Sequence, residues 1–140
     1  MNKAFETSTL VRFAHVDSAG IVFYPRYLEM LNGAVEDWCD QALGVDFNTL
    51  HVERRIGLPT VRLEVEFITP GRLGDHLTIR ISPTQIGRTS CHINVEFMCE
   101  GETRLSARVV LVCMSLDEHR ACEWPADMRS RIVEELVEAA

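Results

Sequence analysis

The stretch HVDSAGIVFYPRY, residues 15–27, determines how the rest of the chain is interpreted. It places one carboxylate, Asp17, on a turn of small residues, with an apolar segment before it and a proline after it. Pro25 suits the first turn of an α-helix, where its missing N–H is not needed. The amides at a helix start have no intrahelical partner and carry partial positive charge. The stretch therefore predicts a carboxylate beside unpaired donors, an arrangement suited to attack on a carbonyl carbon.

Regular periodicities flank this turn on both sides. Residues 7–14 alternate well enough to predict a strand. Residues 25–43 repeat apolar positions at spacings of three and four, which predicts a helix with one buried stripe, closed by Gly44. Gly33 inside this helix predicts close packing against a sheet, as compensation for its low helix propensity. Residues 45–57 have no clean period and indicate a loop with room for a helical turn.

Alternating apolar and polar residues predict the remaining strands, with a tight hairpin at Glu100-Gly101-Glu102. These strands are expected within residues 61–67, 77–81, 91–99 and 105–116, the second ending near Pro83. One strand, one long helix and then antiparallel strands describe an α+β domain. The helix is expected to bury its stripe on the concave face of the sheet.

Two features near the C-terminus concern what covers the sheet. Residues 109–114 are apolar on both faces of their strand, so this strand is expected to be central or covered on both sides, and an oligomer is expected. Pro125 opens a second amphipathic helix. The apolar side of this helix carries Met128, Ile132, Val133, Leu136 and Val137.

The composition restricts the classes of function. A chain of 140 residues, 46% hydrophobic and 25% charged, fits a single globular domain over residues 1–140. Its net charge of −7 argues against general nucleic-acid binding. No apolar run approaches the length of a membrane span.

The five cysteines lack the close spacing of a metal or redox site. With the absence of an N-terminal apolar signal segment, they predict free thiols, no bound metal and a cytoplasmic protein. Cys91, Cys99 and Cys113 fall on the apolar phase of their strands and are expected in the core rather than in catalysis.

The order of the elements and the residues of the first stretch resemble the hotdog-fold acyl-CoA thioesterases, in the branch typified by 4-hydroxybenzoyl-CoA thioesterase. The similarity lies in Asp17, a glycine three positions on, an aromatic beside the proline and a second aromatic inside the helix. The stretch VEFITPGRLGDHL, residues 65–77, is similar to the family's strand, proline turn, aspartate and strand. The resemblance covers roughly residues 8–118. Ser18 stands where relatives often have proline, which loosens the turn but keeps the acid.

This resemblance implies a hotdog fold: an antiparallel five-stranded sheet wrapped around one long central helix, plus a C-terminal helix. It implies hydrolysis of an acyl-CoA thioester to free acid and CoA, with no cofactor, because the coenzyme A belongs to the substrate. Phe23 and Tyr24 slightly favour an aromatic or short to medium acyl chain. The resemblance also implies a homotetramer, a dimer of dimers, with active sites at a dimer interface.

Thioester hydrolysis needs a nucleophile or an activated water, and a donor for the oxyanion. Asp17 can attack the carbonyl and form a mixed anhydride, or it can take a proton from water as general base. The residues do not choose between these routes, and the resemblance favours the first. Pro25 has no N–H, so the backbone amide of Tyr24 is the candidate oxyanion donor, and the resemblance implies the same position. The alternative for Asp17 is a turn or helix-capping acid.

Other residues of the first stretch are candidates for contact with the substrate. His15 lies two residues from Asp17, on the same face of an extended chain, and is either a base or a structural hydrogen-bonding group. The side chains of Tyr24 and Tyr27 either line the acyl pocket or pack in the core.

Two later segments complete the predicted site. Gly57-Leu58-Pro59-Thr60 resembles the family segment that walls the acyl pocket, so Pro59 and Thr60 are candidates for substrate contact, although strand entry explains the segment as well. The phosphates of coenzyme A favour arginine and hydroxyl donors. The candidates for this contact, with surface charge as the alternative for the arginines, are Arg88, Thr89, Ser90 and Arg120.

Two other functions are compatible with the same fold. Hydration or dehydration of an acyl thioester needs a paired acid and base across the site, and His15 with Asp17 fits that pairing poorly. A non-catalytic acyl-CoA binder or a structural oligomer is the other alternative, since a fold does not by itself give an activity.

Overall fold

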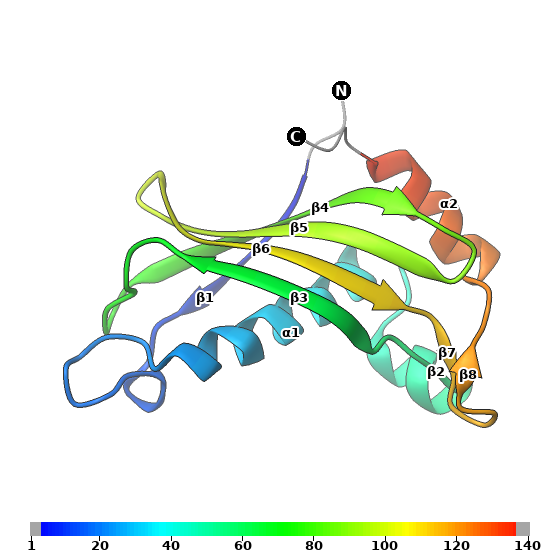
Figure 1. Cartoon of the computed structure of the whole chain (residues 1–140), viewed down its shortest axis with the longest axis horizontal. Helices are drawn as coiled ribbons and strands as arrows, with labels where there is room; N and C mark the ends of the chain where they lie inside the picture. The colour runs from blue at the N-terminus through cyan, green and yellow to red at the C-terminus, as the bar shows by residue number, and fades with distance from the viewer. Residues whose placement is uncertain (1–3, 137–140) are drawn as a thin grey trace.

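The computed structural model describes residues 4–136. Its main sheet has five antiparallel strands in the order β1-β4-β5-β6-β3, and it curves over helix α1 (Figure 1). The bounds are β1 (Phe5–Leu10), β3 (Thr60–Phe67), β4 (His76–Ile86), β5 (Ser90–Cys99), β6 (Glu102–Val112) and α1 (Tyr24–Gln41). The predicted antiparallel sheet wrapped around one long helix is confirmed.

Helix α1 begins one residue before the predicted range of 25–43 and ends two residues before the end of that range. Phe23 caps it, and Pro25 lies in its first turn. Gly44 takes a φ of 78°, which reverses the chain, and the Val45 amide donates to the Cys39 carbonyl at 2.9 Å. A positive φ is easiest for glycine, so the predicted glycine cap is confirmed. The buried stripe consists of Tyr27, Met30, Leu31, Ala34, Val35, Trp38 and Cys39.

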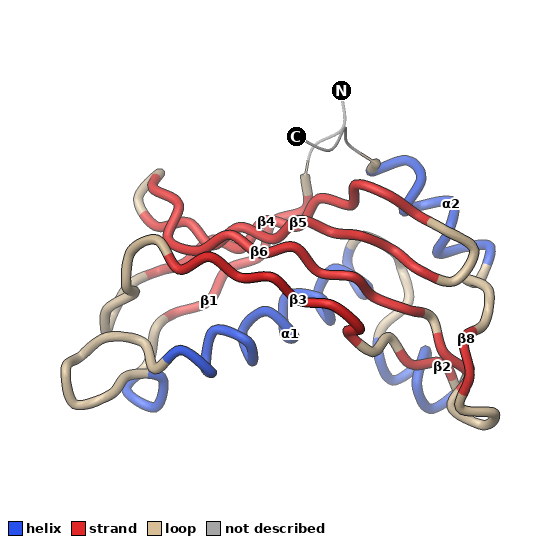
Figure 2. Tube along the Cα trace, viewed as in Figure 1, coloured by secondary structure: helices blue, strands red, loops and turns tan. Residues whose placement is uncertain are grey.

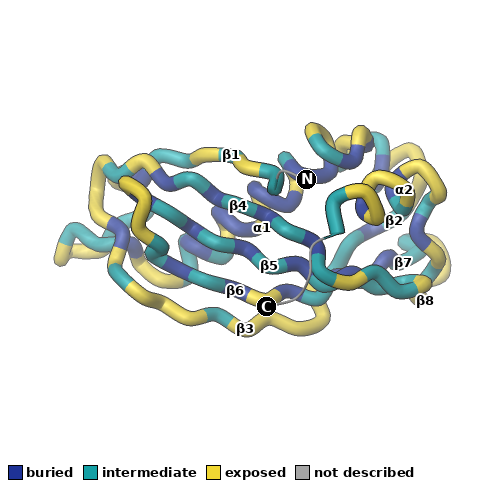
Figure 3. Tube along the Cα trace, turned by 90° about the horizontal axis from the view of Figure 1, so that it is seen from above, coloured by how far each residue is buried: buried dark blue, intermediate teal, exposed yellow. Residues whose placement is uncertain are grey.

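The core lies between this stripe and the concave face of the sheet. Alternate residues of the three central strands are buried, as the banding in Figure 3 shows, and they belong to the same core as the stripe of α1. Trp38 from the helix and Phe97 from β5 are fully enclosed. Each large apolar side chain buried this way contributes about 1.5–3 kcal/mol to the free energy of folding. A shift of one residue would expose all of them, so the period-two pattern fixes which face of each strand is inside.

The edge strand β3 is the exception to this pattern. It is mostly exposed along one border of the sheet (Figure 3), although it carries apolar side chains. Val61, Leu63 and Phe67 are 59%, 40% and 51% exposed. The neighbouring strand β6 was expected to be central or covered on both sides. It lies inside the sheet, between β5 and β3, and Val110 and Val112 on its outer face stay partly exposed. Part of the apolar surface of this sheet therefore lacks a cover within the chain.

Several strand boundaries differ from the expected ones. β1 ends at Leu10, and Phe13–His15 form a 3₁₀ turn instead of continuing the strand. β4 runs through Pro83 to Ile86, because the register shifts between Pro83 and Gln85 and the proline sits at this irregularity. The hairpin between β5 and β6 is as predicted, with Glu100 and Gly101 at φ of 52° and 76°, the combination of a type I′ turn.

A second, smaller sheet lies beside one end of the main sheet (Figure 2). It contains β2 (Ile56–Gly57), β7 (Met114–Ser115) and β8 (Arg120–Ala121), in the order β2-β7-β8. The expected loop before it contains a π-helical turn, Asn48–Glu53. The strand predicted to reach residue 116 is divided into β6 and β7. The break is at Cys113, whose amide donates to the Thr89 carbonyl at 2.7 Å.

The predicted C-terminal helix is α2 (Ala126–Glu135). Met128 and Ile132 are buried, but Val133 is 49% exposed and does not join them. Val137 lies outside the described residues. Arg54 binds Asp127 with two hydrogen bonds of 3.0 and 2.8 Å and so joins α2 to the π-helical turn. Between residues 4 and 136, no helix is both long enough and apolar enough to cross a membrane.

Candidate active site

Asp17 lies on a tight turn immediately before α1. The Asp17 amide donates to the Ile21 carbonyl at 3.0 Å, and the Asp17 carbonyl accepts from the Gly20 amide at 3.0 Å. Val16 and Val22 form a β-bridge across the base of this turn. Gly20 has a φ of 78°, a conformation that strains other residues. Backbone hydrogen bonds within the turn therefore help to hold its shape with Ser18 in place.

The Asp17 carboxylate is exposed and only half engaged. Its Oδ1 accepts a hydrogen bond from the Ala19 amide at 2.9 Å. Oδ2 has no hydrogen-bond partner in the described part of the chain. The turn-capping role that sequence left as an alternative thus uses one oxygen, and the other is available to a substrate carbonyl or a water. Both roles are compatible in one side chain, and the catalytic one stays a prediction.

The first turn of α1 offers one free amide. Pro25 has no N–H, and the Arg26 amide donates to the Phe23 carbonyl at 2.8 Å. The Tyr24 amide has no acceptor among residues 4–136. Its position at the positive end of a long helix suits a developing negative charge. The Tyr24 ring is 61% exposed and meets the Phe67 ring edge-on, with centroids 6.3 Å apart.

His15 and Tyr27 are engaged in structural contacts. His15 Nδ1 accepts a hydrogen bond from the Arg12 amide at 2.8 Å, which closes the 3₁₀ turn and supports the structural alternative for this histidine. Tyr27 is 4% exposed, and its Oη accepts a hydrogen bond from the Gly71 amide at 2.7 Å. Burial raises the pKa of Tyr27. Of the two alternatives left open for this side chain, its burial on the inner stripe of α1 agrees with packing in the core.

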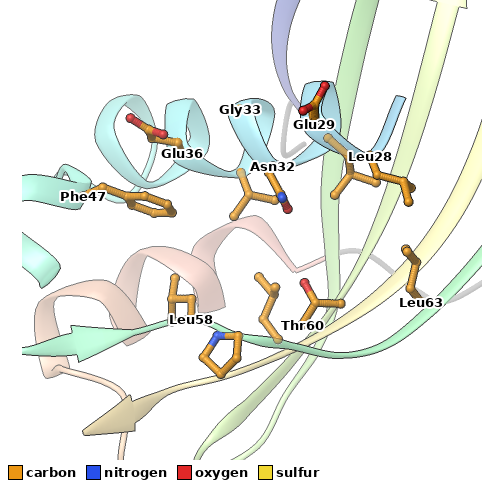
Figure 4. Close-up of a pocket in the computed structure, with 13 residues that line it drawn as sticks. Leu28, Glu29, Asn32, Gly33, Glu36, Phe47, Leu58, Thr60 and Leu63 are labelled. Atoms are coloured by element: carbon orange, nitrogen blue, oxygen red, sulfur yellow. The ribbon is translucent and has the colours of Figure 1, made fainter. Parts of the chain in front are cut away.

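A groove of about 730 Å³ runs between α1 and β3 (Figure 4). Pro59 and Thr60 line it together with Leu58, as the predicted wall segment requires. Asn32 from α1 and Thr60 from β3 point into it from opposite sides (Figure 4). Asn32 was missed by sequence reasoning, because a polar residue off the apolar stripe of a helix looks like solvated surface. Only the position of β3 opposite α1 shows that Asn32 lines a groove.

Gly33 does not pack against the sheet as predicted. It is exposed on the groove side of α1, and no atom lies within 4 Å of the place where a Cβ would stand. The predicted close packing against the sheet is therefore wrong, because residue 33 lies off the buried stripe. Within one protomer the surface over this glycine is open.

The predicted site residues fall into two places within the protomer. Asp17 and Tyr24 do not line the groove that contains Pro59 and Thr60. The Tyr24 ring contacts Phe67 at the end of β3, whereas Thr60 begins the same strand. One copy of the chain therefore places Asp17 and this groove at opposite ends of its edge strand.

The predicted CoA-binding segment borders a cavity of about 270 Å³, lined by Gly87, Arg88, Glu123, Trp124 and Arg129. Arg88 is exposed and forms an ion pair with Glu123 at 3.0 Å. Arg129, which sequence reasoning missed, donates to the Gly87 carbonyl at 2.8 Å. Thr89 and Ser90 are engaged through their carbonyls, which accept from the Cys113 amide and the Trp124 indole. Arg120 lies on β8 and does not line this cavity.

All five cysteines are free thiols. Burial raises the pKa of Cys39, Cys91 and Cys113 to about 12, so these thiols stay protonated at neutral pH and are poor nucleophiles. Cys91, Cys99 and Cys113 lie in the core, as predicted. Over residues 4–136, no three His, Cys, Asp or Glu side chains are grouped as metal ligands would be.

The fold and the turn before α1 define a hotdog thioesterase. Residues 11–132 match the model of the Thioesterase-like superfamily, and the chain belongs to this family. It is 29% identical over 90 residues to a 1,4-dihydroxy-2-naphthoyl-CoA hydrolase of Crocosphaera subtropica, an alignment that covers 64% of this chain and 65% of that one. A protein of the same name from Synechocystis is 26% identical over 124 residues, which cover 87% and 89% of the two chains.

A solved structure agrees with these sequence similarities. The structure of BH1999 gentisyl-coenzyme A thioesterase superimposes with a TM-score of 0.81 at 26% identity, covering 89% of this chain and 99% of that one. The predicted family, fold and class of enzyme, a thioester hydrolase, are thereby confirmed.

Proposed function

We propose that the protein hydrolyses the thioester bond of an aromatic acyl-CoA, with Asp17 as the reacting carboxylate and the Tyr24 amide as the oxyanion donor. The observation that carries this proposal is the unpartnered Oδ2 of Asp17 on a fixed turn, next to a helix start whose first amide is also free. A capping aspartate can also expose one oxygen, so the free amide of Tyr24 beside it is the part of this observation that favours catalysis.

The chemistry follows one of two routes. In the first, Oδ2 attacks the thioester carbonyl, the C–S bond breaks, CoA leaves as a thiolate that takes a proton, and water then hydrolyses the mixed anhydride. In the second, Asp17 removes a proton from a water that attacks the carbonyl, the C–S bond breaks, and the CoA thiolate takes up that proton, which gives the free acid and CoA. Both routes pass through a tetrahedral oxyanion, which the Tyr24 amide stabilises. Loss of such a donor typically costs about 10²–10³ in rate. The family resemblance favours the first route.

The acyl group is assigned to the groove between α1 and β3. Relatives are named for 1,4-dihydroxy-2-naphthoyl-CoA and gentisyl-coenzyme A, both of which have aromatic acyl groups. Leu58, Pro59 and Leu63 supply apolar walls for a ring, and Asn32 and Thr60 supply polar groups for ring hydroxyls. The volume of about 730 Å³ is in the range of small-molecule sites.

A second copy of the chain is needed to bring Asp17 to such a groove. β3 is an edge strand with an unpaired border and exposed apolar side chains, a surface that favours pairing with another chain. Two β3 edges related by a two-fold axis run antiparallel, so the Phe67 end of one copy meets the Thr60 end of the other. The Asp17 turn of one protomer would then face the groove of its partner. The homotetramer and the cytoplasmic location remain predictions of the same proposal.

Arg88 and Arg129 are proposed to hold phosphates of coenzyme A at the cavity beside Trp124. Glu123 neutralises Arg88 in the free protein and would be displaced by a phosphate. Arg120 stays a weaker candidate for the same contact.

Thiol release from a panel of aromatic and aliphatic acyl-CoAs tests the proposal. We expect the highest kcat/KM for hydroxylated aromatic thioesters and a loss of at least 100-fold in Asp17→Ala. Equal, low rates for wild type and Asp17→Ala on every thioester would contradict it. Acyl-CoA binding without hydrolysis would support the non-catalytic alternative. Hydration of an enoyl-CoA without thiol release would support a hydratase, which the engagement of His15 by Arg12 disfavours.

A further inference from the structure

The turn that carries Asp17 packs against a second turn, residues 71–75, which is distant in sequence. The Val22 amide donates to the Gly71 carbonyl at 2.9 Å, and the Leu73 amide donates to the Gly20 carbonyl at 3.2 Å. Ile21 and Arg72 form a β-bridge between these two contacts. The Asp17 turn is thus held along one side by the backbone of residues 71–73.

Helix α1 contacts the same second turn through a hydrogen bond. Tyr27, three residues after Tyr24, is buried, and its Oη accepts the hydrogen bond of the Gly71 amide at 2.7 Å. The Gly71 amide therefore donates to Tyr27 of the helix, and the Gly71 carbonyl accepts from Val22 beside the Asp17 turn. A Cβ at residue 71 would stand 2.9 Å from Tyr27 Oη and 3.1 Å from Val22 Cγ2, so a side chain there would force the two apart.

The remaining contacts of the second turn go to the turn itself and to the sheet. Arg72 donates its amide to Asp75 Oδ2 at 2.9 Å, and Arg104 Nη1 donates to the Pro70 carbonyl at 3.2 Å. Arg104 and Asp75 also lie 3.7 Å apart as an ion pair. These contacts hold the second turn against the sheet, whereas the Tyr27 hydroxyl joins it to the helix.

We propose that Tyr27 is a positioning residue for the reaction: through Gly71, its hydroxyl sets the placement of the Asp17 carboxylate relative to the Tyr24 amide. Both reacting groups depend on this connection, because Tyr24 begins the helix that carries Tyr27, and Asp17 lies on the turn that Gly71 supports. The inference rests on the proposed roles of Asp17 and Tyr24. Tyr27 itself is buried and does not touch the substrate.

The substitution Tyr27→Phe tests this inference, because it removes one hydroxyl and keeps the ring. We expect kcat for an aromatic acyl-CoA to fall about 10- to 100-fold, the usual effect of misplacing reacting groups, while KM changes less than about twofold. Thr7→Val is the matched control. It removes a partly buried hydrogen bond, 2.8 Å long, between β1 and Asp37 of α1. It should lower Tm comparably and leave kcat unchanged.

Gly71→Ala tests the same contact from the other side, and it keeps the inference testable if Tyr27→Phe does not fold. Its Cβ should push the second turn off the Tyr27 hydroxyl and lower kcat to a similar extent. Because both substitutions act on one contact, the double variant should be no slower than the slower single variant, a non-additive result. Multiplicative losses in the double variant would overturn the inference.

The remaining outcomes separate this inference from the proposed function. A folded Tyr27→Phe with kcat within twofold of wild type overturns the positioning role, provided that Asp17→Ala is inactive in the same assay. Equal kcat losses in Tyr27→Phe and Thr7→Val also overturn it, because they indicate general destabilisation. Full activity in Asp17→Ala overturns the proposed function itself.

Discussion

The Asp17 carboxylate accepts a hydrogen bond from the Ala19 amide at 2.9 Å and leaves its second oxygen exposed. This contact fixes the side chain without neutralising it. A carboxylate held at the tip of a turn loses little conformational freedom when substrate binds, which is the main advantage of an intramolecular geometry. The same turn lies against the start of α1, so the proposed attacking group and the proposed oxyanion donor come from adjoining elements of one protomer.

Mixed oligomers test whether the active site is shared between two copies. Asp17→Ala removes the carboxylate of one protomer, and Thr60→Trp fills the groove of another. Because each site would take its turn from one copy and its groove from the other, a mixed dimer of these two inactive variants contains one intact site. We expect refolding them together at a one-to-one ratio to restore about a quarter of the wild-type rate, the statistical share of intact sites.

The control is a mixture of the two variants that were refolded separately and combined afterwards. The activity of the co-refolded sample is compared with that of this control. No recovery in co-refolded samples, with native mass spectrometry showing mixed dimers, would mean that the turn and groove of one chain act together. A monomeric wild-type protein with full activity would equally contradict a shared site.

Arg88 is expected to bind the nucleotide part of coenzyme A without affecting chemistry. Its ion pair with Glu123 is exposed, and such pairs contribute at most about 1 kcal/mol to stability. Arg88→Ala should therefore raise KM about tenfold or more, the value of one charge-assisted hydrogen bond, and leave kcat nearly unchanged. Glu123→Gln should lower KM, since it frees the guanidinium.

An acyl-pantetheine substrate, which lacks the nucleotide, provides the control. Arg88→Ala should hydrolyse it as wild type does, and Arg108→Ala, on the outer face of the sheet, should leave both substrates unaffected. Similar losses on both substrates would show that Arg88 acts through the fold instead.

Glu135 gives the fold a predictable response to pH. Its Oε1 accepts a hydrogen bond from Trp38 Nε1 at 3.2 Å, and burial raises the pKa of its carboxyl. The folded state therefore holds the proton more tightly than the unfolded state. Stability from this group is fully present below the unfolded pKa and is lost as the pH rises through the folded pKa. Glu135→Gln should raise Tm at pH 7 and leave it unchanged near pH 4.

Thermal unfolding of both proteins across this pH range measures the effect. The exposed carboxylate Glu118, changed to Gln, is the control and should show no comparable gain. A lower Tm for Glu135→Gln at neutral pH would contradict this account of the helix α2 contact.

Much of the fold was predictable because its elements bury one face each. The spacing of the apolar residues in α1 and the alternation in β4 and β5 follow directly from which side meets the core. β4 ran past Pro83 because an irregularity in register removes the need for an amide there. The exposed apolar side chains of β3 resemble those of a buried strand, and only the strand order reveals that it lies at an edge.

The candidate site was predictable only where its parts are local in sequence. Asp17, Gly20 and the free Tyr24 amide lie within one short stretch, so turn and helix chemistry place them. Asn32 depends on a strand that passes opposite it, and Tyr27 depends on Gly71, distant in sequence. Such contacts follow from tertiary packing, which periodicity does not encode.

Asp17→Asn provides the most direct measurement, because the amide keeps an oxygen for the Ala19 contact and loses only the negative charge. Thiol release from an aromatic acyl-CoA should be readily detected in wild type. It should fall about 100- to 10,000-fold in kcat in the variant, as expected for a lost nucleophile or general base. The Tm should change little, since the residue is exposed. A folded Asp17→Asn protein that releases CoA at the wild-type rate would contradict the central role of this carboxylate.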